Sequence, residues 1–206
     1  MKKKKIIIPI LVLSLLAPTW YVNNYSIKLT KQTIYSEKVG NDIKIAVISD
    51  LHGEDLGKNN SKITGLISEQ NPDLIFVLGD MYTQNHYEQI DTAVELAENL
   101  SKTADTYVVT GDHDTDRKYA DKLSSLQNVY LMNYKKADLS INGTDITIYG
   151  IDNVYFSPTF DLHNEFDEPD SNRLNILLAH IPGTEHFEDF GVDIIFSGDT
   201  HGGMIR

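Results

Sequence analysis

Several residue types are absent or scarce in this chain of 206 residues, and each absence narrows what the protein can do. It contains no cysteine, which excludes disulfides, thiolate metal sites, iron–sulfur clusters and a cysteine nucleophile. Any metal would therefore bind nitrogen and oxygen ligands. The G-x-S-x-G motif of serine hydrolases is missing, and so is any internal repeat. The length predicts one or at most two globular domains.

Basic residues are scarce relative to acidic ones. The chain has 18 Lys and Arg against 30 Asp and Glu, a formal net charge of -12. Four of the lysines lie at residues 2–5, so the remainder is more acidic still. Such a surface repels polyanions, and we expect no nucleic-acid partner. Many of the carboxylates stand beside histidines, a pattern that indicates metal binding.

The first 25 residues differ in character from the rest. Four lysines precede an apolar run over residues 6–17, which ends near Trp20 and Tyr21. The run is shorter than the ~20 residues of a relaxed transmembrane helix, as in a signal peptide, but no A-x-A cleavage site follows it. We expect an uncleaved membrane anchor over residues 1–25, with residues 26–206 outside the cytoplasm. Secretion after cleavage is the alternative.

Beyond the N-terminal segment, short apolar runs alternate with amphipathic stretches, which predicts a layered α/β fold. Residues 74–78 and 174–179 are continuous apolar runs of strand length. Apolar residues of the 90–100 segment recur with the spacing of one helical face. Asn142-Gly143 separates two alternating runs and predicts a hairpin. Further strands are predicted over 26–35, 43–48, 106–109 and 192–196, and further helices around 63–67 and 119–126.

Five of the predicted strands end in a polar cluster. The clusters are Asp50-Leu51-His52, Gly79-Asp80, Gly111-Asp112-His113-Asp114, His180, and Gly198-Asp199-Thr200-His201. Each alone has a plain interpretation, because Gly-Asp is a common turn and a single histidine is often a core or capping residue.

Together the five clusters are more specific. The carboxyl ends of strands in layered α/β folds line one crevice, so these side chains are expected to converge. An extended backbone would point Asp50 and His52 the same way, and glycine before Asp80, Asp112 and Asp199 would permit close packing. Converging carboxylates repel one another unless cations neutralise them. Two divalent ions resolve that conflict. The loop of Tyr82, His86 and Tyr87 either overhangs this site or is plain surface.

The ordered clusters resemble the calcineurin-like metallophosphoesterase superfamily, whose pattern is D-x-H, G-D, G-N-H-[DE], a single His and G-H-x-H. The resemblance extends from Ile43 to the end of the chain. The sequence is similar in pattern to bacterial members that carry an N-terminal membrane anchor. It implies a four-layer α/β/β/α sandwich. Only seven residues follow Asp199, so we expect the C-terminal part of this fold to be incomplete.

The resemblance also implies residue roles. Asp50, His52 and His201 would hold the first metal, and Asp80 would bridge both ions. The second metal would be held by Asp112, His180 and Asp199. His113 would stabilise transition-state charge or protonate the leaving group, with Asp114 orienting its imidazole.

Two residues depart from the family pattern. Asp112 replaces its asparagine, and Asp199 replaces the first histidine of G-H-x-H. The predicted ligand set then holds four carboxylates, which makes a harder site. We expect two divalent ions, with Mn or Fe favoured and Mg or Zn possible.

The resulting hypothesis is a metal-dependent phosphoester hydrolase in which a hydroxide bridging two metals is the nucleophile. The alternative is a non-catalytic exported module that binds metal or phosphate and whose second metal site has degraded. The expected substrate is a small-molecule or lipid-linked phosphoester, and the expected location is the outer side of the cell membrane.

Overall fold

The computed structural model describes residue 14 and residues 27–152, 160–183 and 187–201. The chain divides into two compact units, Met1–Ile34 and Tyr35–Arg206. The expected membrane anchor lies outside the described residues apart from Ser14, and no helix in the described part is long and apolar enough to cross a membrane. The predicted strand over 26–35 is wrong for residues 27–35, which have no regular secondary structure. Alternating polarity makes a strand only where a neighbouring strand pairs with it.

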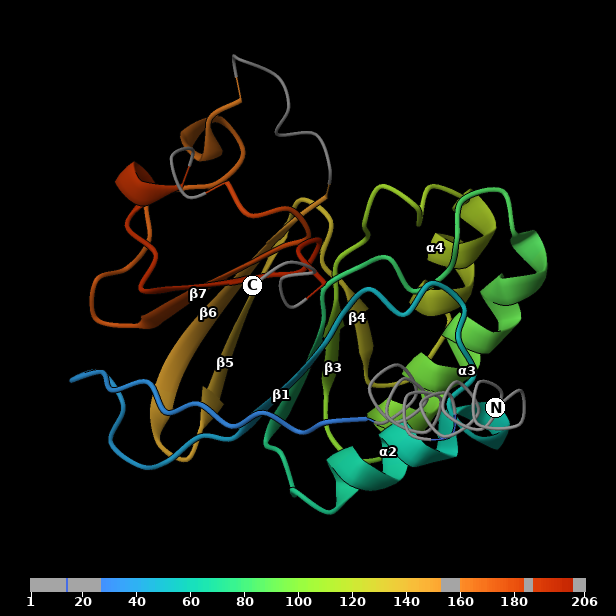
Figure 1. Cartoon of the computed structure of the whole chain (residues 1–206). Helices are drawn as coiled ribbons and strands as arrows, with labels where there is room; N and C mark the ends of the chain where they lie inside the picture. Colours follow the sequence, from blue (N-terminus) through green and yellow to red (C-terminus); the bar gives the residue numbers. More distant parts are fainter. Residues whose placement is uncertain (1–13, 15–26, 153–159, 184–186, 202–206) are drawn as a thin grey trace, which may run out of the picture. The chain divides into compact units, whose positions relative to one another are not determined.

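The first sheet is parallel throughout and has the strand order β1-β2-β3-β4. Figure 1 shows helices α2, α3 and α4 grouped on one side of it. Three strands were predicted, whereas β4 is too short to stand out in the sequence. The elements are β1 Ile45–Ile48, α2 Ser61–Ser68, β2 Leu74–Val77, α3 Ile90–Ser101, β3 Thr106–Val108, α4 Arg117–Ser124 and β4 Val129–Leu131, with 3-10 turns η1 Lys58–Asn60 and η2 Tyr87–Gln89.

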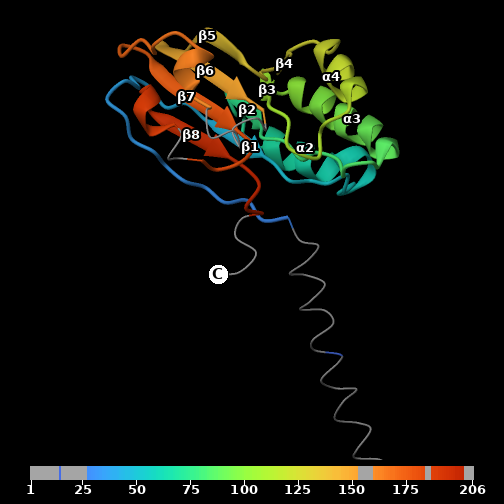
Figure 2. The ribbon, with the colours of Figure 1, turned by 90° about the horizontal axis from the view of Figure 1, so that it is seen from above.

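The second sheet has the order β5-β6-β7-β8 and lies face to face with the first (Figure 2). Its strands are β5 Lys135–Ile141, β6 Thr144–Ile151, β7 Leu174–Ala179 and β8 Ile194–Ser197. The β5–β6 pair is antiparallel, and the other pairs are parallel. Asn142 and Gly143 both have positive φ, 51° and 81°, which is the hairpin geometry that this dipeptide favours. The predicted hairpin is confirmed.

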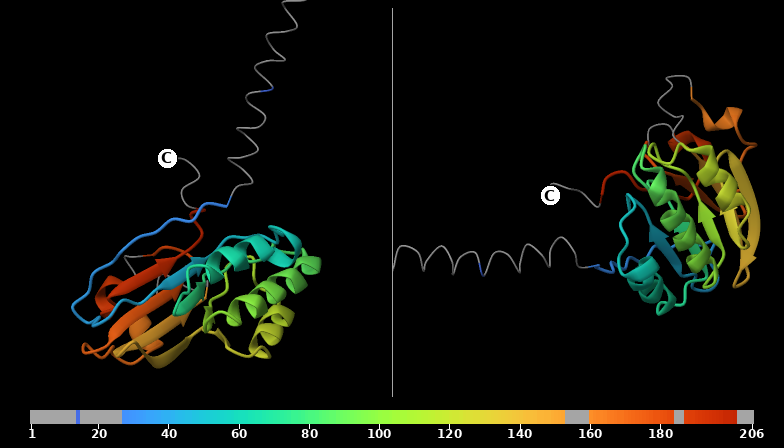
Figure 3. Two further views of the ribbon diagram at one scale, coloured as in Figure 1. Left: turned by 90° about the horizontal axis from the view of Figure 1, so that it is seen from below. Right: turned by 90° about the vertical axis from the view of Figure 1, so that its right-hand side faces the viewer.

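Strand β2 shows how the apolar sequence makes the layers. Successive side chains of a strand point to opposite faces, and a strand covered on both faces is apolar throughout. Leu74 and Phe76 enter the core between the two sheets, whereas Ile75 and Val77 enter the core beneath the helices. Figure 3 (right) looks onto these helices, with the sheets behind them.

A third apolar cluster covers the outer face of the second sheet. Tyr149 and Leu177 of this sheet pack there with Leu162, Phe187 and Phe190. In the described part this fourth layer consists of two 3-10 turns, η4 Leu162–Asn164 and η6 Glu188–Phe190. The predicted two-sheet sandwich of the α/β class is confirmed.

Candidate metal centre

The predicted polar clusters meet because their strands run in the same direction. Asp50 follows β1 and Asp80 follows β2, and the amide of Asp50 donates to the carbonyl of Gly79 at 3.0 Å. The next ladder bond joins the amide of His52 to the carbonyl of Asp80 at 2.9 Å. Between the ends of β7 and β8, the amide of Gly198 donates to the carbonyl of His180 at 2.7 Å.

The backbone at these strand ends is left-handed at five predicted ligands. Their φ values are positive, a region that non-glycine residues rarely adopt, and such conformations concentrate at functional sites. The prediction that Asp50 and His52 share one extended segment is therefore wrong. Their side chains converge because the chain turns sharply at each of them. The five residues are Asp50 (58°), His52 (47°), Asp80 (55°), Asp199 (60°) and His201 (48°).

Close approach explains the glycines that precede the aspartates. A Cβ atom at Gly111 would overlap the Asp80 carboxylate. One at Gly79, where φ is 91°, would overlap the backbone of Gly111. One at Gly198 would lie 2.7 Å from Oγ of Ser49, the residue before Asp50. The tight packing predicted from these glycines is confirmed.

The first predicted ligand group is assembled as expected. One ligand atom each from Asp50, His52 and His201 lies within 4.8 Å of the others. Nε2 of His52 is 3.3 Å from Nε2 of His201, and the latter is 3.7 Å from Oδ1 of Asp50. Burial lowers the pKa of His52, which keeps the imidazole neutral as a metal ligand must be.

The second predicted group is also assembled, from Asp112, His180 and Asp199. Nε2 of His180 is 3.6 Å from Oδ1 of Asp112 and 4.0 Å from Oδ1 of Asp199. His180 is fully buried, and its Nδ1 lies 2.7 Å from the carbonyl of Leu78. A carbonyl only accepts, so Nδ1 carries a proton, and Nε2 faces the two carboxylates, where it can bind a cation once it is deprotonated.

The Asp80 carboxylate lies between the two groups. Its Oδ2 atom is 3.7 Å from Nε2 of His52 and 3.4 Å from Nε2 of His180. Burial raises the pKa of Asp80, but His180 and the His113 amide outweigh burial and lower it. For His180, burial lowers the pKa, yet Asp80 and the Leu78 carbonyl raise it to about 9. Without a metal, a proton on His180 offsets part of the site's negative charge.

Divalent cations fit this arrangement. Nε2 of His180 is buried and has no hydrogen-bond partner, although it points at carboxylates. Four carboxylates and three imidazoles of the predicted set converge, which is a donor set for Mn, Fe, Mg or Zn. The Lys and Arg ion pairs that the structure describes all lie elsewhere, namely Lys38–Asp193, Arg117–Asp121, Lys122–Asp91 and Arg173–Asp138.

His113 lies at the same edge. Its amide donates to Oδ1 of Asp80 at 3.0 Å, and its ring centroid is 4.7 Å from that of His52. The ring's Nδ1 accepts the amide N–H of Gln84 at 3.1 Å.

No described hydrogen bond joins Asp114 to the His113 ring, contrary to the expectation. Its buried carboxylate accepts the amides of Met81 (3.0 Å), Tyr82 (3.3 Å) and Gly111 (3.2 Å). Burial raises the pKa of Asp114 to about 6 although these amide bonds lower it. The expected orienting bond is wrong because the carboxylate faces these amides. Asp114 joins the loops after β2 and β3, and a catalytic role for it stays a prediction.

Sequence reasoning missed two residues at this edge. Asn133 follows β4 and exchanges two hydrogen bonds with Thr110, just before Gly111. Asp152 follows β6, whose last residue pairs with Ala179, so it stands beside the strand end that carries His180. One Asp152 carboxylate oxygen is covered and has no hydrogen-bond partner among the described residues. Neither residue belongs to a motif.

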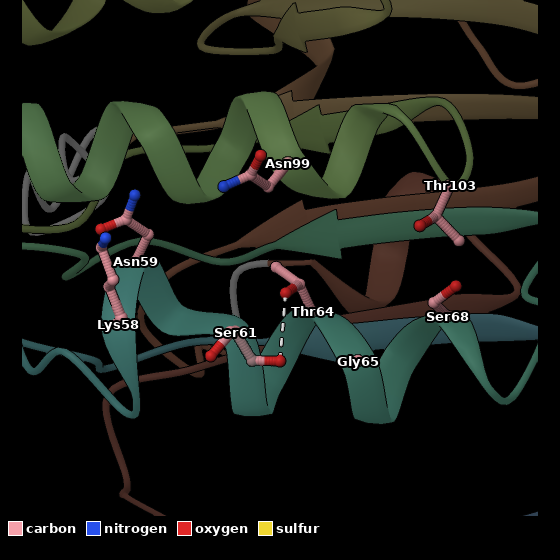
Figure 4. Close-up of a pocket in the computed structure, with 8 residues that line it drawn as sticks. All are labelled: Lys58, Asn59, Ser61, Thr64, Gly65, Ser68, Asn99 and Thr103. Carbon is pink, nitrogen blue, oxygen red and sulfur yellow. Dashed lines mark hydrogen bonds between the residues drawn. The ribbon is translucent and has the colours of Figure 1, made fainter.

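A separate surface hollow of about 400 Å³ lies between α2 and α3. Figure 4 shows that its walls are mainly small polar side chains, with Lys58 as the one charged residue drawn. It is lined by none of the seven predicted ligands.

The fold and the site define a metallophosphoesterase domain: two facing sheets, outer helices, and metal-ligand types at the carboxyl ends of five strands. Residues 43–203 match the calcineurin-like phosphoesterase family, and the chain belongs to that family. The family resemblance predicted from the motifs is confirmed.

Relatives and solved structures agree with this assignment. An uncharacterized metallophosphoesterase of Helicobacter pylori (strain J99) is 25% identical over 86% of this chain and 50% of its own length. Another, YkuE of Bacillus subtilis, is 26% identical over 90% of this chain and 68% of its own. The Haemophilus influenzae NAD nucleotidase structure shares the fold, with a TM-score of 0.52, 18% identity and coverage of 77% of this chain and 38% of that one. The chain spans about half the length of the Helicobacter relative.

Proposed function

We propose that this protein is a phosphoester hydrolase with a binuclear metal centre. The observation that carries the proposal is the position of Asp80, whose carboxylate lies between His52 of one ligand group and His180 of the other. A carboxylate so placed can bridge two ions. Two ions held there would supply the chemistry of a hydroxide nucleophile and an electrostatic clamp on the phosphoryl oxygens.

The protein's own residues have separable tasks in this proposal. The Leu78 carbonyl orients the His180 ring so that Nε2 faces the Asp80 carboxylate. Asp50 and Asp199 are joined directly, since the amide of Asp199 donates to Oδ1 of Asp50 at 3.0 Å. This bond links the two ligand groups directly, and links of this kind help to orient metal ligands.

The acidic donor set favours Mn or Fe in the two positions, with Mg or Zn also able to bind. Carboxylate oxygens are hard ligands, and the three imidazoles make the donor set softer than carboxylates alone would be. An ion missing from one position would leave the carboxylates of that position to repel a phosphate. Hydrolysis should therefore rise steeply with added divalent metal.

Metal stoichiometry tests the proposal most directly. The full chain, purified in mild detergent, loaded with Mn²⁺ and desalted, should hold close to two ions by elemental mass spectrometry, and it should hydrolyse aryl phosphates. Asp80→Asn should lower the occupancy of both positions, because it removes the shared ligand. One ion per wild-type chain would contradict the binuclear centre.

The alternative, a binding module without catalysis, has a specific observation in its favour. The side chains of Asp112 and Asp199, which replace family residues, are 53% and 45% exposed, so the second position is open on one side. His113→Ala separates the two functions. A hydrolase should keep its two ions and lose turnover, whereas a binding module has no turnover to lose.

We further propose that residues 1–25 anchor the protein in the membrane, with the hydrolase domain outside the cytoplasm. The acidic surface disfavours nucleic acid, so the substrate is a small-molecule or lipid-linked phosphoester. A Danio rerio relative, 24% identical over 80% of this chain, is named a transmembrane protein with a metallophosphoesterase domain. Fractionation of expressing cells, with protease added to intact spheroplasts, tests the anchor and its orientation. Recovery of the full chain in the soluble cytoplasmic fraction would contradict both.

A further inference from the structure

A turn in the loop that follows Asp80 lies beside the candidate metal centre. The amide of His86 donates to the carbonyl of Thr83 at 2.9 Å, and Asn85 has a φ of 67°. A positive φ at the third position is the pattern of a type II turn. The Thr83 hydroxyl donates to the carbonyl of His52 at 3.1 Å, and the Thr83 amide donates to Oε1 of Gln89 at 2.8 Å. The turn is therefore tied to a predicted metal ligand and to the start of α3.

The second residue of this turn contacts His113. The backbone N–H of Gln84 lies 3.1 Å from Nδ1 of His113. A backbone N–H can only donate, so Nδ1 must offer its lone pair. A neutral imidazole with a lone pair at Nδ1 carries its proton at Nε2.

His113 and a metal-bound His180 would therefore hold their protons on opposite ring nitrogens. The Leu78 carbonyl places the His180 proton at Nδ1 and leaves Nε2 free to bind a cation. The Gln84 amide places the His113 proton at Nε2, which can donate a hydrogen bond but cannot bind a cation while it holds that proton. Judged by distance alone, His52, Asp80 and His113 could also hold one ion. The Nε2 proton distinguishes His113 from the other two, because a protonated nitrogen cannot bind a cation.

We propose that the Thr83–His86 turn is a positioning element that holds His113 as a hydrogen-bond donor at Nε2, directed at an oxygen of the phosphoryl group. The inference rests on the proposed hydrolase function and selects between the two roles expected for His113. While Nδ1 accepts the Gln84 amide, release of the Nε2 proton would leave an imidazolate anion beside Asp80. His113 therefore stabilises negative charge and does not protonate the leaving group.

The tautomer can be read without any activity. Two-dimensional ¹H–¹⁵N spectra of the ¹⁵N-histidine-labelled full chain, loaded with diamagnetic Zn²⁺, distinguish Nδ1–H, Nε2–H and metal-bound rings. The His113 resonances are identified by their loss in His113→Ala. We expect the Nε2–H form. An Nδ1–H or metal-bound His113 in the wild-type chain would overturn the proposal.

A matched pair of variants tests the turn. Gln84→Pro removes the donating N–H at a turn position that favours proline, whereas Gln84→Ala keeps the N–H and removes only the side chain. Gln84→Pro should abolish the single Nε2–H pattern, and Gln84→Ala should retain it. Equal spectra for the two variants would show that the turn does not set the tautomer. The wild-type spectrum decides the tautomer itself if Gln84→Pro does not fold.

Leaving-group dependence tests the role of the donor. Removing one hydrogen-bond donor to a developing anion costs about 10²–10³ in kcat. His113→Ala should lower kcat by a similar factor for aryl phosphates whose leaving groups are good or poor. A loss that grows with leaving-group pKa would show proton donation and overturn this role. If no phosphoester is hydrolysed, the proposed function fails, while the spectra still report the tautomer.

Discussion

Nε2 of His180 lies 3.4 Å from Oδ2 of Asp80, both side chains are buried, and no hydrogen bond satisfies that nitrogen. An unsatisfied buried polar atom is unfavourable in a folded protein, by about 1–3 kcal/mol. A metal ion would relieve this unfavourable state, because it would bind the lone pair and reduce repulsion among the carboxylates. The pair of side chains therefore fits the proposed metal centre, in which a cation would take the place of a proton on His180.

His180→Asn tests this relationship. The shorter amide can still donate to the Leu78 carbonyl but cannot reach the Asp80 carboxylate. We expect metal content to fall from two ions to one and metal affinity at the second position to fall by more than the 10–100-fold typical of a lost outer-shell partner. The control is His163→Asn, a partly exposed histidine that pairs with Asp161 outside the candidate centre. Two retained ions in His180→Asn would contradict the assignment of His180.

The pH dependence of stability should change with metal. Asp80 and the Leu78 carbonyl raise the pKa of His180 from its ordinary 6.5 to about 9 despite burial. A raised pKa stabilises the folded protein fully below pH 6.5, and that contribution is lost as the pH rises through 9. Urea unfolding of the metal-free chain should therefore show falling stability over this window.

Two controls accompany this measurement. His180→Asn should lack this component of the slope. Bound Mn²⁺ should reverse the sign of this pH slope, because metal binds the neutral imidazole and binding strengthens as protons leave. A metal-free wild type whose slope equals that of His180→Asn would show that His180 is not the titrating group.

Much of the fold could be predicted from the sequence. A strand that is buried on both faces, such as 74–78, consists of apolar residues without interruption and is easy to recognise. Strand β4 escaped prediction because three residues, of which one is buried, are too short a run to stand out in the sequence. The seven candidate ligands could be proposed from the sequence because each follows a predicted strand. Their left-handed backbone was not, since Asp and His adopt positive φ more often than other side chains but still in a minority of cases. The contact of Gln84 with His113 was equally hidden, because a backbone amide has no side-chain identity to read.

Gly111 should tolerate no side chain. In Gly111→Ala the new methyl group would overlap the Asp80 carboxylate, so the loop or that carboxylate must move. Overpacking of this kind destabilises by about 1–3 kcal/mol, and we expect weaker binding at both metal positions as well. Denaturant unfolding and metal titration measure the two effects.

The matched substitution is Gly65→Ala in α2, where a Cβ meets nothing within 4 Å. Alanine is the better helix former, so this variant should gain about 0.5–1 kcal/mol and bind metal normally. Equal behaviour of the two variants would mean that the strand-end glycines are not needed for close packing.

Restoring the family's residues should change which metal the site prefers. Asp112→Asn with Asp199→His removes two carboxylates from the second ligand group and adds an imidazole. Softer nitrogen donors favour Zn over Mn, so the ratio of Zn to Mn affinity at this position should rise about tenfold or more, which is ~1.4 kcal/mol. A surface pair, Asp145→Asn with Asp189→Asn, alters exposed carboxylates outside the ligand groups and should leave the ratio unchanged. Competition between the two metals, read by elemental mass spectrometry, gives the ratio. If both double variants shifted it equally, overall charge rather than ligand type would govern metal choice.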